Sequence, residues 1–98
     1  LLVKTMRLDT YFKKNKIKRI DFMKIDAEQS DLDCLKSLGK YINKLKLLKI
    51  ECTAQTYKEI FYYLNSKSFI FLGIKNNKYV NNEFSCGDFF FINTRFKN

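Results

Sequence analysis

The segment Ile20-Asp21-Phe22-Met23-Lys24-Ile25-Asp26-Ala27-Glu28 contains a short apolar run that ends in two carboxylates. Apolar residues bounded by charged ones over 18–26 are typical of a β-strand that is covered on both faces. Apolar residues then recur every three or four positions, as on one face of an amphipathic helix: Leu32, Leu35, Leu38, Ile42 and Leu45. A strand followed directly by a helix predicts an α/β fold.

The rest of the chain continues the alternation of strands and helices. Residues 46–52 alternate between apolar and polar side chains, which is the period of a strand. The residues Thr56-Tyr57-Lys58-Glu59 have the spacing of a capping box and open a second helical stripe that reaches Leu64. The other expected elements are an extended segment at 3–8, a helix at 9–15 with Asp9 as its N-cap, a strand at 69–72, an asparagine-rich loop at 76–82 and a strand at 88–92.

This order of elements predicts how the strands run. Strands that alternate with helices favour a sheet with parallel neighbours, so we expect a thin, mostly parallel α/β sheet. The last two strands have no helix between them, and we expect them to run antiparallel. One edge of so small a sheet stays exposed unless further chain covers it.

The composition limits the chemistry of these 98 residues. With 46% hydrophobic residues, ten Phe, six Tyr and no Pro, the chain is a small globular domain or a piece of a larger one. The absence of His excludes Ser-His-Asp and Cys-His catalysis, so a general base would be a carboxylate, Lys or Tyr. Cysteines at 34, 52 and 86 are too widely spaced for a zinc site and fit a reducing, cytoplasmic compartment. No apolar run is long enough for a membrane span, and we predict none.

The formal net charge of +9 raises the alternative of a binding module for nucleic acid or another polyanion. Basic residues cluster at Lys13, Lys14, Lys16, Lys18 and Arg19. Sixteen of the basic residues are Lys and only three are Arg, whereas base readout favours the bidentate guanidinium of Arg. We therefore favour a solvated cluster over a nucleic-acid site.

Asp26 and Glu28 are the first candidates for a functional site. Open α/β sheets bind ligands at the carboxyl ends of their strands, and both residues follow the strand at 18–26. A tight turn there would aim both carboxylates into one cleft. The competing interpretation is that they cap the following helix and complement its dipole. Two carboxylates alone are weak evidence for a divalent cation, so no metal site is predicted.

The sequence around these carboxylates resembles the FkbM family of methyltransferases. The residues from Lys24 to Lys36 resemble the family signature Lys-Ile-Asp-Val-Glu-Gly-Ala-Glu…Leu-Lys-Gly, and Thr5-Met6-Arg7-Leu8-Asp9-Thr10-Tyr11 resembles the Leu-Asp element that precedes it. The segment Leu47-Leu48-Lys49-Ile50-Glu51 resembles the next strand, and Gly87-Asp88-Phe89-Phe90-Phe91 resembles a terminal strand.

This resemblance implies a partial Rossmann-like class I methyltransferase sheet, mostly parallel with an antiparallel last strand. It implies that residues 1–98 are the C-terminal portion of the domain, without the N-terminal half that holds the cofactor. The implied reaction is S-adenosylmethionine-dependent methylation of a hydroxyl on a sugar or other small molecule, and we expect the fragment alone to be inactive. The implied catalytic residues are Asp26, which also lies near the cofactor's methyl group, and Glu28. Glu28 and Glu51 are the implied substrate-binding residues.

Two alternatives to an active enzyme remain open. A polyanion-binding module predicts basic residues gathered on one surface, whereas the enzyme predicts carboxylates at strand ends beside a cavity. A decayed copy would keep the fold without turnover.

Overall fold

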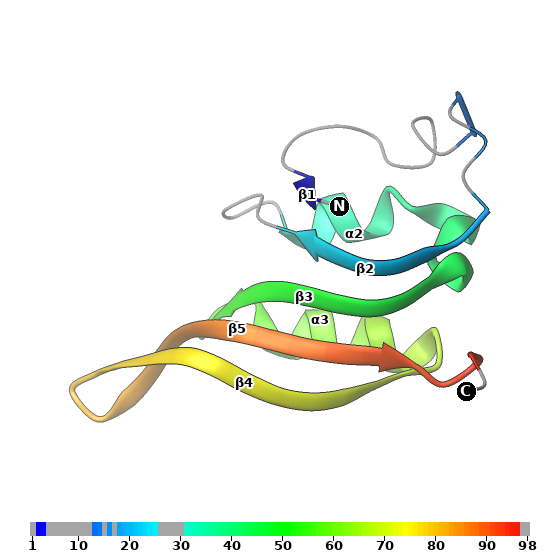
Figure 1. Ribbon diagram of the computed structural model, residues 1–98. Helices are drawn as coiled ribbons and strands as arrows, with labels where there is room; N and C mark the ends of the chain where they lie inside the picture. The colour runs from blue at the N-terminus through cyan, green and yellow to red at the C-terminus, as the bar shows by residue number, and fades with distance from the viewer. Residues whose placement is uncertain (1, 4–12, 15, 17, 26–30, 97–98) are drawn as a thin grey trace.

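The computed structural model describes residues 2–3, 13–14, 16, 18–25 and 31–96 (Figure 1). Within these ranges five strands form one sheet in the order β1-β2-β3-β5-β4. The strands are β1 (Leu2–Val3), β2 (Ile20–Ile25), β3 (Leu45–Thr53), β4 (Phe69–Val80) and β5 (Glu83–Asn93). The helices are α2 (Asp31–Lys36), the 3₁₀ helix η2 (Gly39–Lys44) and α3 (Tyr57–Ser66).

The sheet is mixed, so the prediction of a mostly parallel, Rossmann-like sheet is wrong. The pairs β1–β2 and β2–β3 are parallel, but β5 is antiparallel to both of its neighbours, β3 and β4. The two antiparallel pairs extend over more residues than the two parallel pairs because β4 and β5 are the longest strands. The prediction that the last two strands run antiparallel is confirmed.

A two-residue turn explains why β4 and β5 are longer than the sequence indicated. Val80 pairs with Glu83, and between them Asn81 and Asn82 have φ values of 53° and 66°. Two successive positive φ values are the signature of a type I′ hairpin turn, which matches the twist of the strands it joins. Asn76 and Asn77, which we expected in a loop, lie inside β4 where its pairing with β5 shifts register.

The described helices lie on one face of the sheet (Figure 1). Apolar side chains of that face meet buried residues of the helices in one continuous core. Met23, Leu48 and Phe91 are register partners across β2, β3 and β5, and all three are at most 1% exposed. Leu35 of α2 and Ile60 and Leu64 of α3 are fully buried over the same face.

The opposite face of the sheet carries a row of apolar side chains that no described helix covers. Pairing places Phe22 beside Leu47, Leu47 beside Ile92 and Ile92 beside Ile70. Phe22 is 41% exposed and Ile70 is 50% exposed. The expectation that β2 is covered on both faces is therefore not met by the described residues.

The helix expected from Leu32 to Leu45 is interrupted. The α-helix ends at Lys36, and Gly39 has a φ of 53°, a conformation that favours glycine. The 3₁₀ helix η2 follows, and Leu45 already belongs to β3. Ile42 of η2 is nevertheless buried, so the apolar pattern continues past the break although the α-helix does not.

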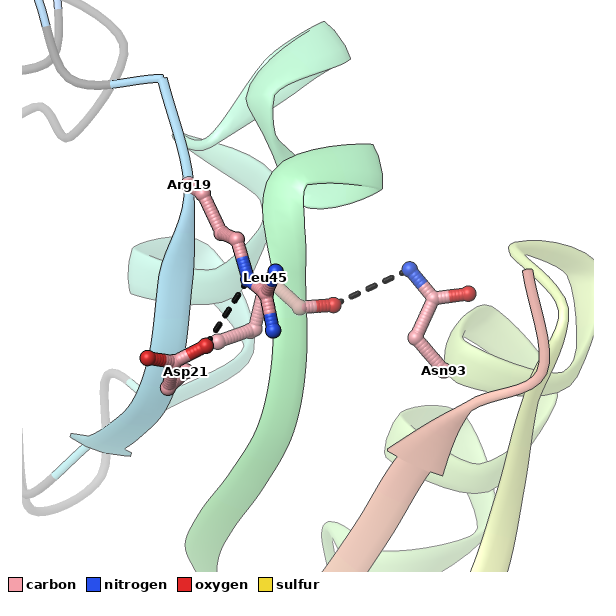
Figure 2. Close-up of polar contacts among 4 residues, drawn as sticks. All are labelled: Arg19, Asp21, Leu45 and Asn93. Atoms are coloured by element: carbon pink, nitrogen blue, oxygen red, sulfur yellow. Dashed lines mark hydrogen bonds and ion pairs between the residues drawn. The ribbon is translucent and has the colours of Figure 1, made fainter. Parts of the chain in front are cut away.

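Polar contacts fix the beginning of β3 to its neighbours (Figure 2). The buried side-chain amide of Asn93 donates a hydrogen bond of 3.0 Å to the main-chain oxygen of Leu45. At the start of β2 the Nε of Arg19, the residue before the strand, lies 2.8 Å from Oδ1 of Asp21 in an exposed ion pair (Figure 2). In the ranges given above, no helix is long and apolar enough to cross a membrane.

Candidate functional site

A polar hollow lies where the parallel strands β2 and β3 approach their carboxyl ends. It has a volume of about 220 Å³ and is lined by Lys24, Ile25, Lys49, Glu51 and Asp88. Strand register explains why these residues meet, because Lys24 pairs with Lys49 and Glu51 pairs with Asp88. The side chains of paired residues stand on the same face of a sheet. We call this set of five residues the strand-end hollow.

Of the site residues predicted from the sequence, only Glu51 lies in the described part of the chain. Asp26 and Glu28 fall outside the described residues, so their predicted roles remain predictions. β2 ends at Ile25, whose register partner is Ile50, the residue before Glu51. Glu51 is exposed at the strand-end hollow, where an acceptor carboxylate can reach a ligand.

Asp88 is a residue of the hollow that the sequence analysis did not single out. Its Oδ2 atom accepts a hydrogen bond of 3.0 Å from Nδ2 of Asn76 and lies 3.6 Å from Nζ of Lys49. The side chains of Lys49 and Asp88 are only 23% and 20% exposed, so water screens this pair less than it screens a surface pair. The sequence signal for Asp88 is an acidic residue directly before the aromatic run Phe89-Phe90-Phe91. Its partner Asn76 comes close to it because β4 and β5 form a hairpin.

Two lysines lie near the ring of Phe90, next to Asp88. The Nζ atoms of Lys49 and Lys75 are each 5.9 Å from the ring centroid. Cation–π contacts of this length are favourable. The positive charge of this face is therefore spread over β3 and β4 around the half-buried carboxylate of Asp88.

Cys34 and Cys52 are buried and offer no nucleophile at the hollow. Burial, followed by the charges of Asp31 and Glu51, raises the pKa of Cys52 to about 12. Burial, followed by the charge of Asp31, also raises the pKa of Cys34. A thiol with a raised pKa stays protonated and unreactive at neutral pH. Across the described ranges, no group of three potential ligands could hold a metal ion.

The strand-end hollow does not fit a whole molecule of S-adenosylmethionine. Small-molecule sites typically enclose about 300–1,000 Å³, which is more than the hollow provides. The glycines are also in the wrong places: Gly39 follows α2, whereas Gly73 and Gly87 lie inside β4 and β5. None of them forms the glycine-rich turn from strand to helix that cradles a nucleotide cofactor. We therefore assign no described residue to this cofactor.

One member of the exposed basic cluster, Arg19, has its charge paired. Arg19 is paired with Asp21, and its guanidinium lies 5.3 Å from the ring centroid of Phe96. Lys13, Lys14 and Lys18 are exposed. Carboxylates beside a hollow at the strand ends are what the enzyme hypothesis predicts, and this arrangement favours it over the polyanion-binding module.

Comparison with known proteins places the chain in a family. The methyltransferase FkbM domain matches residues 2–80, a range that includes β1 to β4 and four of the five residues of the hollow, Lys24, Ile25, Lys49 and Glu51. No curated protein and no solved structure matches the chain. Because the match extends over most of the sequence, the chain belongs to the methyltransferase FkbM domain family.

Proposed function

We propose that the chain is the C-terminal portion of an FkbM-type methyltransferase that transfers a methyl group from S-adenosylmethionine to a hydroxyl of a small molecule. The observation that carries this proposal is the family match over residues 2–80, which includes the two strands that end at the hollow. Family membership supports a methyl donor, and S-adenosylmethionine is the donor that we propose. The donor-binding residues would lie in a part of the enzyme other than the described residues.

The proposal gives the carboxylates near the strand ends distinct roles. Methylation of a hydroxyl releases a proton, and a positioned carboxylate can accept it. Asp26 is the proposed base and Glu28 the second candidate, because both follow β2 directly in the sequence. Glu51 is proposed to accept a hydrogen bond from the substrate, which its exposed position at the hollow supports.

The first experiment tests whether the 98-residue chain binds the methyl donor by itself. Calorimetric titration of the 98-residue chain with S-adenosylmethionine should show no measurable binding, because the described residues offer no cradle for it. Micromolar binding would refute the assignment of residues 1–98 to the C-terminal portion alone.

The second experiment tests the roles of the carboxylates in the full-length enzyme. Methyl transfer from labelled S-adenosylmethionine to a panel of hydroxylated small molecules would identify an acceptor. We expect Asp26→Asn to lower kcat by roughly 10²–10⁴-fold, the usual contribution of a general base, while the midpoint of urea unfolding stays unchanged. The exposed Asp33→Asn serves as a matched control with the same charge change. If kcat is the same in both variants, Asp26 is not the base.

A further inference from the structure

Lys24 and Lys49 form a pair of ammonium groups on one wall of the strand-end hollow. They are register partners on the parallel strands β2 and β3, and adjacent strands lie about 4.8 Å apart. Both side chains are partly buried and both line the hollow. Two positive charges that line one partly buried hollow repel each other.

Among the described residues, an ion pair is seen for Lys49 and not for Lys24. Asp88 lies 3.6 Å from Lys49 and also accepts a hydrogen bond from Asn76, so its Oδ2 atom is fully engaged. Among the described residues the ion pairs are Arg19–Asp21 and Lys49–Asp88, and neither includes Lys24. The ammonium of Lys24 is therefore the group of the hollow that an anionic ligand would stabilise most.

Glu51 adds a hydrogen-bond acceptor to the lining of the hollow. It is exposed, pairs in register with Asp88 and follows Lys49 by two positions on the same face of β3. An ionised carboxylate accepts hydrogen bonds and suits a hydroxyl donor. Its repulsion of a bound anion is reduced because solvent screens an exposed charge.

We propose that the hollow binds small hydroxylated compounds that carry an oxyanion, either a carboxylate or a phosphate. Lys24 binds the oxyanion, Lys49 adds positive charge while it holds Asp88 in place, and Glu51 accepts the hydroxyl hydrogen bond. An ammonium acts as a point charge, so this wall suits both oxyanions. The inference rests on the proposed function in one respect, namely that such a compound would be the methyl acceptor.

Binding can be measured without any methyl donor, using glycerate and glycerol 3-phosphate as probes and uncharged glycerol for comparison. Amide chemical shifts of residues in β2 and β3 would report site-specific binding. We expect both charged probes to shift these amides in a saturable manner, and glycerol to leave them unchanged. A response to one charged probe alone would identify carboxylate or phosphate as the preferred oxyanion.

Three variants distinguish a built site from diffuse attraction by a chain of net charge +9. Lys24→Gln should weaken binding of the charged probes by roughly tenfold, the loss of one charge-assisted hydrogen bond. Lys24→Arg should restore most of the affinity, which also excludes misfolding as the cause. Lys58→Gln removes the same charge from an exposed position on α3 and should change the affinity less than twofold.

The outcomes separate this inference from the proposed function. Equal effects of Lys24→Gln and Lys58→Gln would overturn the oxyanion site, whatever the enzyme methylates. Site-specific binding in a full-length protein that transfers no methyl group would refute the proposed function and leave the oxyanion site standing. Methylation of an uncharged acceptor, unaffected by Lys24→Gln, would overturn the inference and leave the function standing.

Discussion

The side-chain amide of Asn93 donates a hydrogen bond of 3.0 Å to the main-chain oxygen of Leu45, 48 residues earlier in the chain. Both residues are buried, with Asn93 1% exposed and Leu45 fully buried. The Oδ1 atom of Asn93 accepts a hydrogen bond of 3.0 Å from the main-chain amide of Arg95. One side chain therefore joins the last residue of β5 to the first residue of β3.

We expect Asn93→Ala to lower the free energy of unfolding by about 1–3 kcal/mol. The substitution leaves the carbonyl of Leu45 without its side-chain partner, and an unsatisfied buried polar group costs this amount. Urea unfolding followed by circular dichroism would measure the loss. Asn65→Ala, at an exposed position on α3, is the matched control and should stay within about 0.5 kcal/mol. Equal stability of the two variants would show that the Asn93 contact contributes nothing.

Local patterns predicted the strands that face the core, but not the contacts between distant segments. The alternation at 46–52 predicted β3 correctly, because its period reports burial of one face directly. The expected last strand ended at 92, since nothing near Asn93 indicates that its amide reaches a carbonyl 48 residues away. For the same reason the sequence did not identify Asp88 as a site residue, because its partner Asn76 lies across the β4–β5 hairpin.

The loop predicted from the four asparagines at 76–82 is only partly correct. Asn81 and Asn82 form the turn, whereas Asn76 and Asn77 lie within β4. Both pairs tolerate irregular backbone, and Asn76 also has a positive φ, of 54°. The asparagines therefore predicted where the backbone is irregular, but they did not distinguish a hairpin turn from a shift of strand register.

The turn itself supplies the second prediction. Asn82 has a φ of 66°, a left-handed conformation that costs a residue with an ordinary Cβ roughly 1–2 kcal/mol. Asn82→Ala should therefore destabilise the protein by about 1 kcal/mol. Asn82→Gly should change the stability by no more than about 0.5 kcal/mol, because Asn-Gly is the preferred sequence for this turn. Thermal unfolding of the two variants would measure both effects. If alanine is tolerated as well as glycine, the turn does not hold residue 82 at positive φ.

Two glycines in the β4–β5 hairpin should respond very differently to the same substitution. A Cβ at Gly87 would lie 2.9 Å from Cγ2 of Ile74 and 3.2 Å from Cα of Asn77. The second contact is with backbone, which cannot rotate away, so Gly87→Ala should cost about 1–3 kcal/mol.

Gly73→Ala is the control for this prediction, because a Cβ there meets nothing within 4 Å. It should be neutral or slightly stabilising, since alanine restricts the unfolded chain more than glycine does. Urea unfolding would compare the two variants under identical conditions. A larger loss for Gly73→Ala than for Gly87→Ala would contradict the close packing of β4 against β5 at Gly87.

The fully buried thiol of Cys52 makes stability depend on pH in the alkaline range. Its pKa is raised from 9.0 to about 12, first by burial and then by the charges of Asp31 and Glu51. Below pH 9 the thiol is protonated in both the folded and the unfolded chain, and its full contribution to stability is present. Between pH 9 and 12 the unfolded chain releases this proton while the folded chain keeps it. The free energy of unfolding should therefore fall as pH rises, by about 1.4 kcal/mol per unit for this group.

Removing the thiol isolates its part of the pH dependence. Other side chains also contribute to the alkaline pH dependence, so the informative quantity is the difference between the original protein and Cys52→Ala. Cys52→Ala should be less stable at pH 8, because the substitution empties space in the core, and should lose less stability between pH 9 and 11. Urea unfolding at half-unit pH intervals would measure both slopes. Parallel slopes for the two proteins would mean that Cys52 ionises as readily in the folded chain as in the unfolded one.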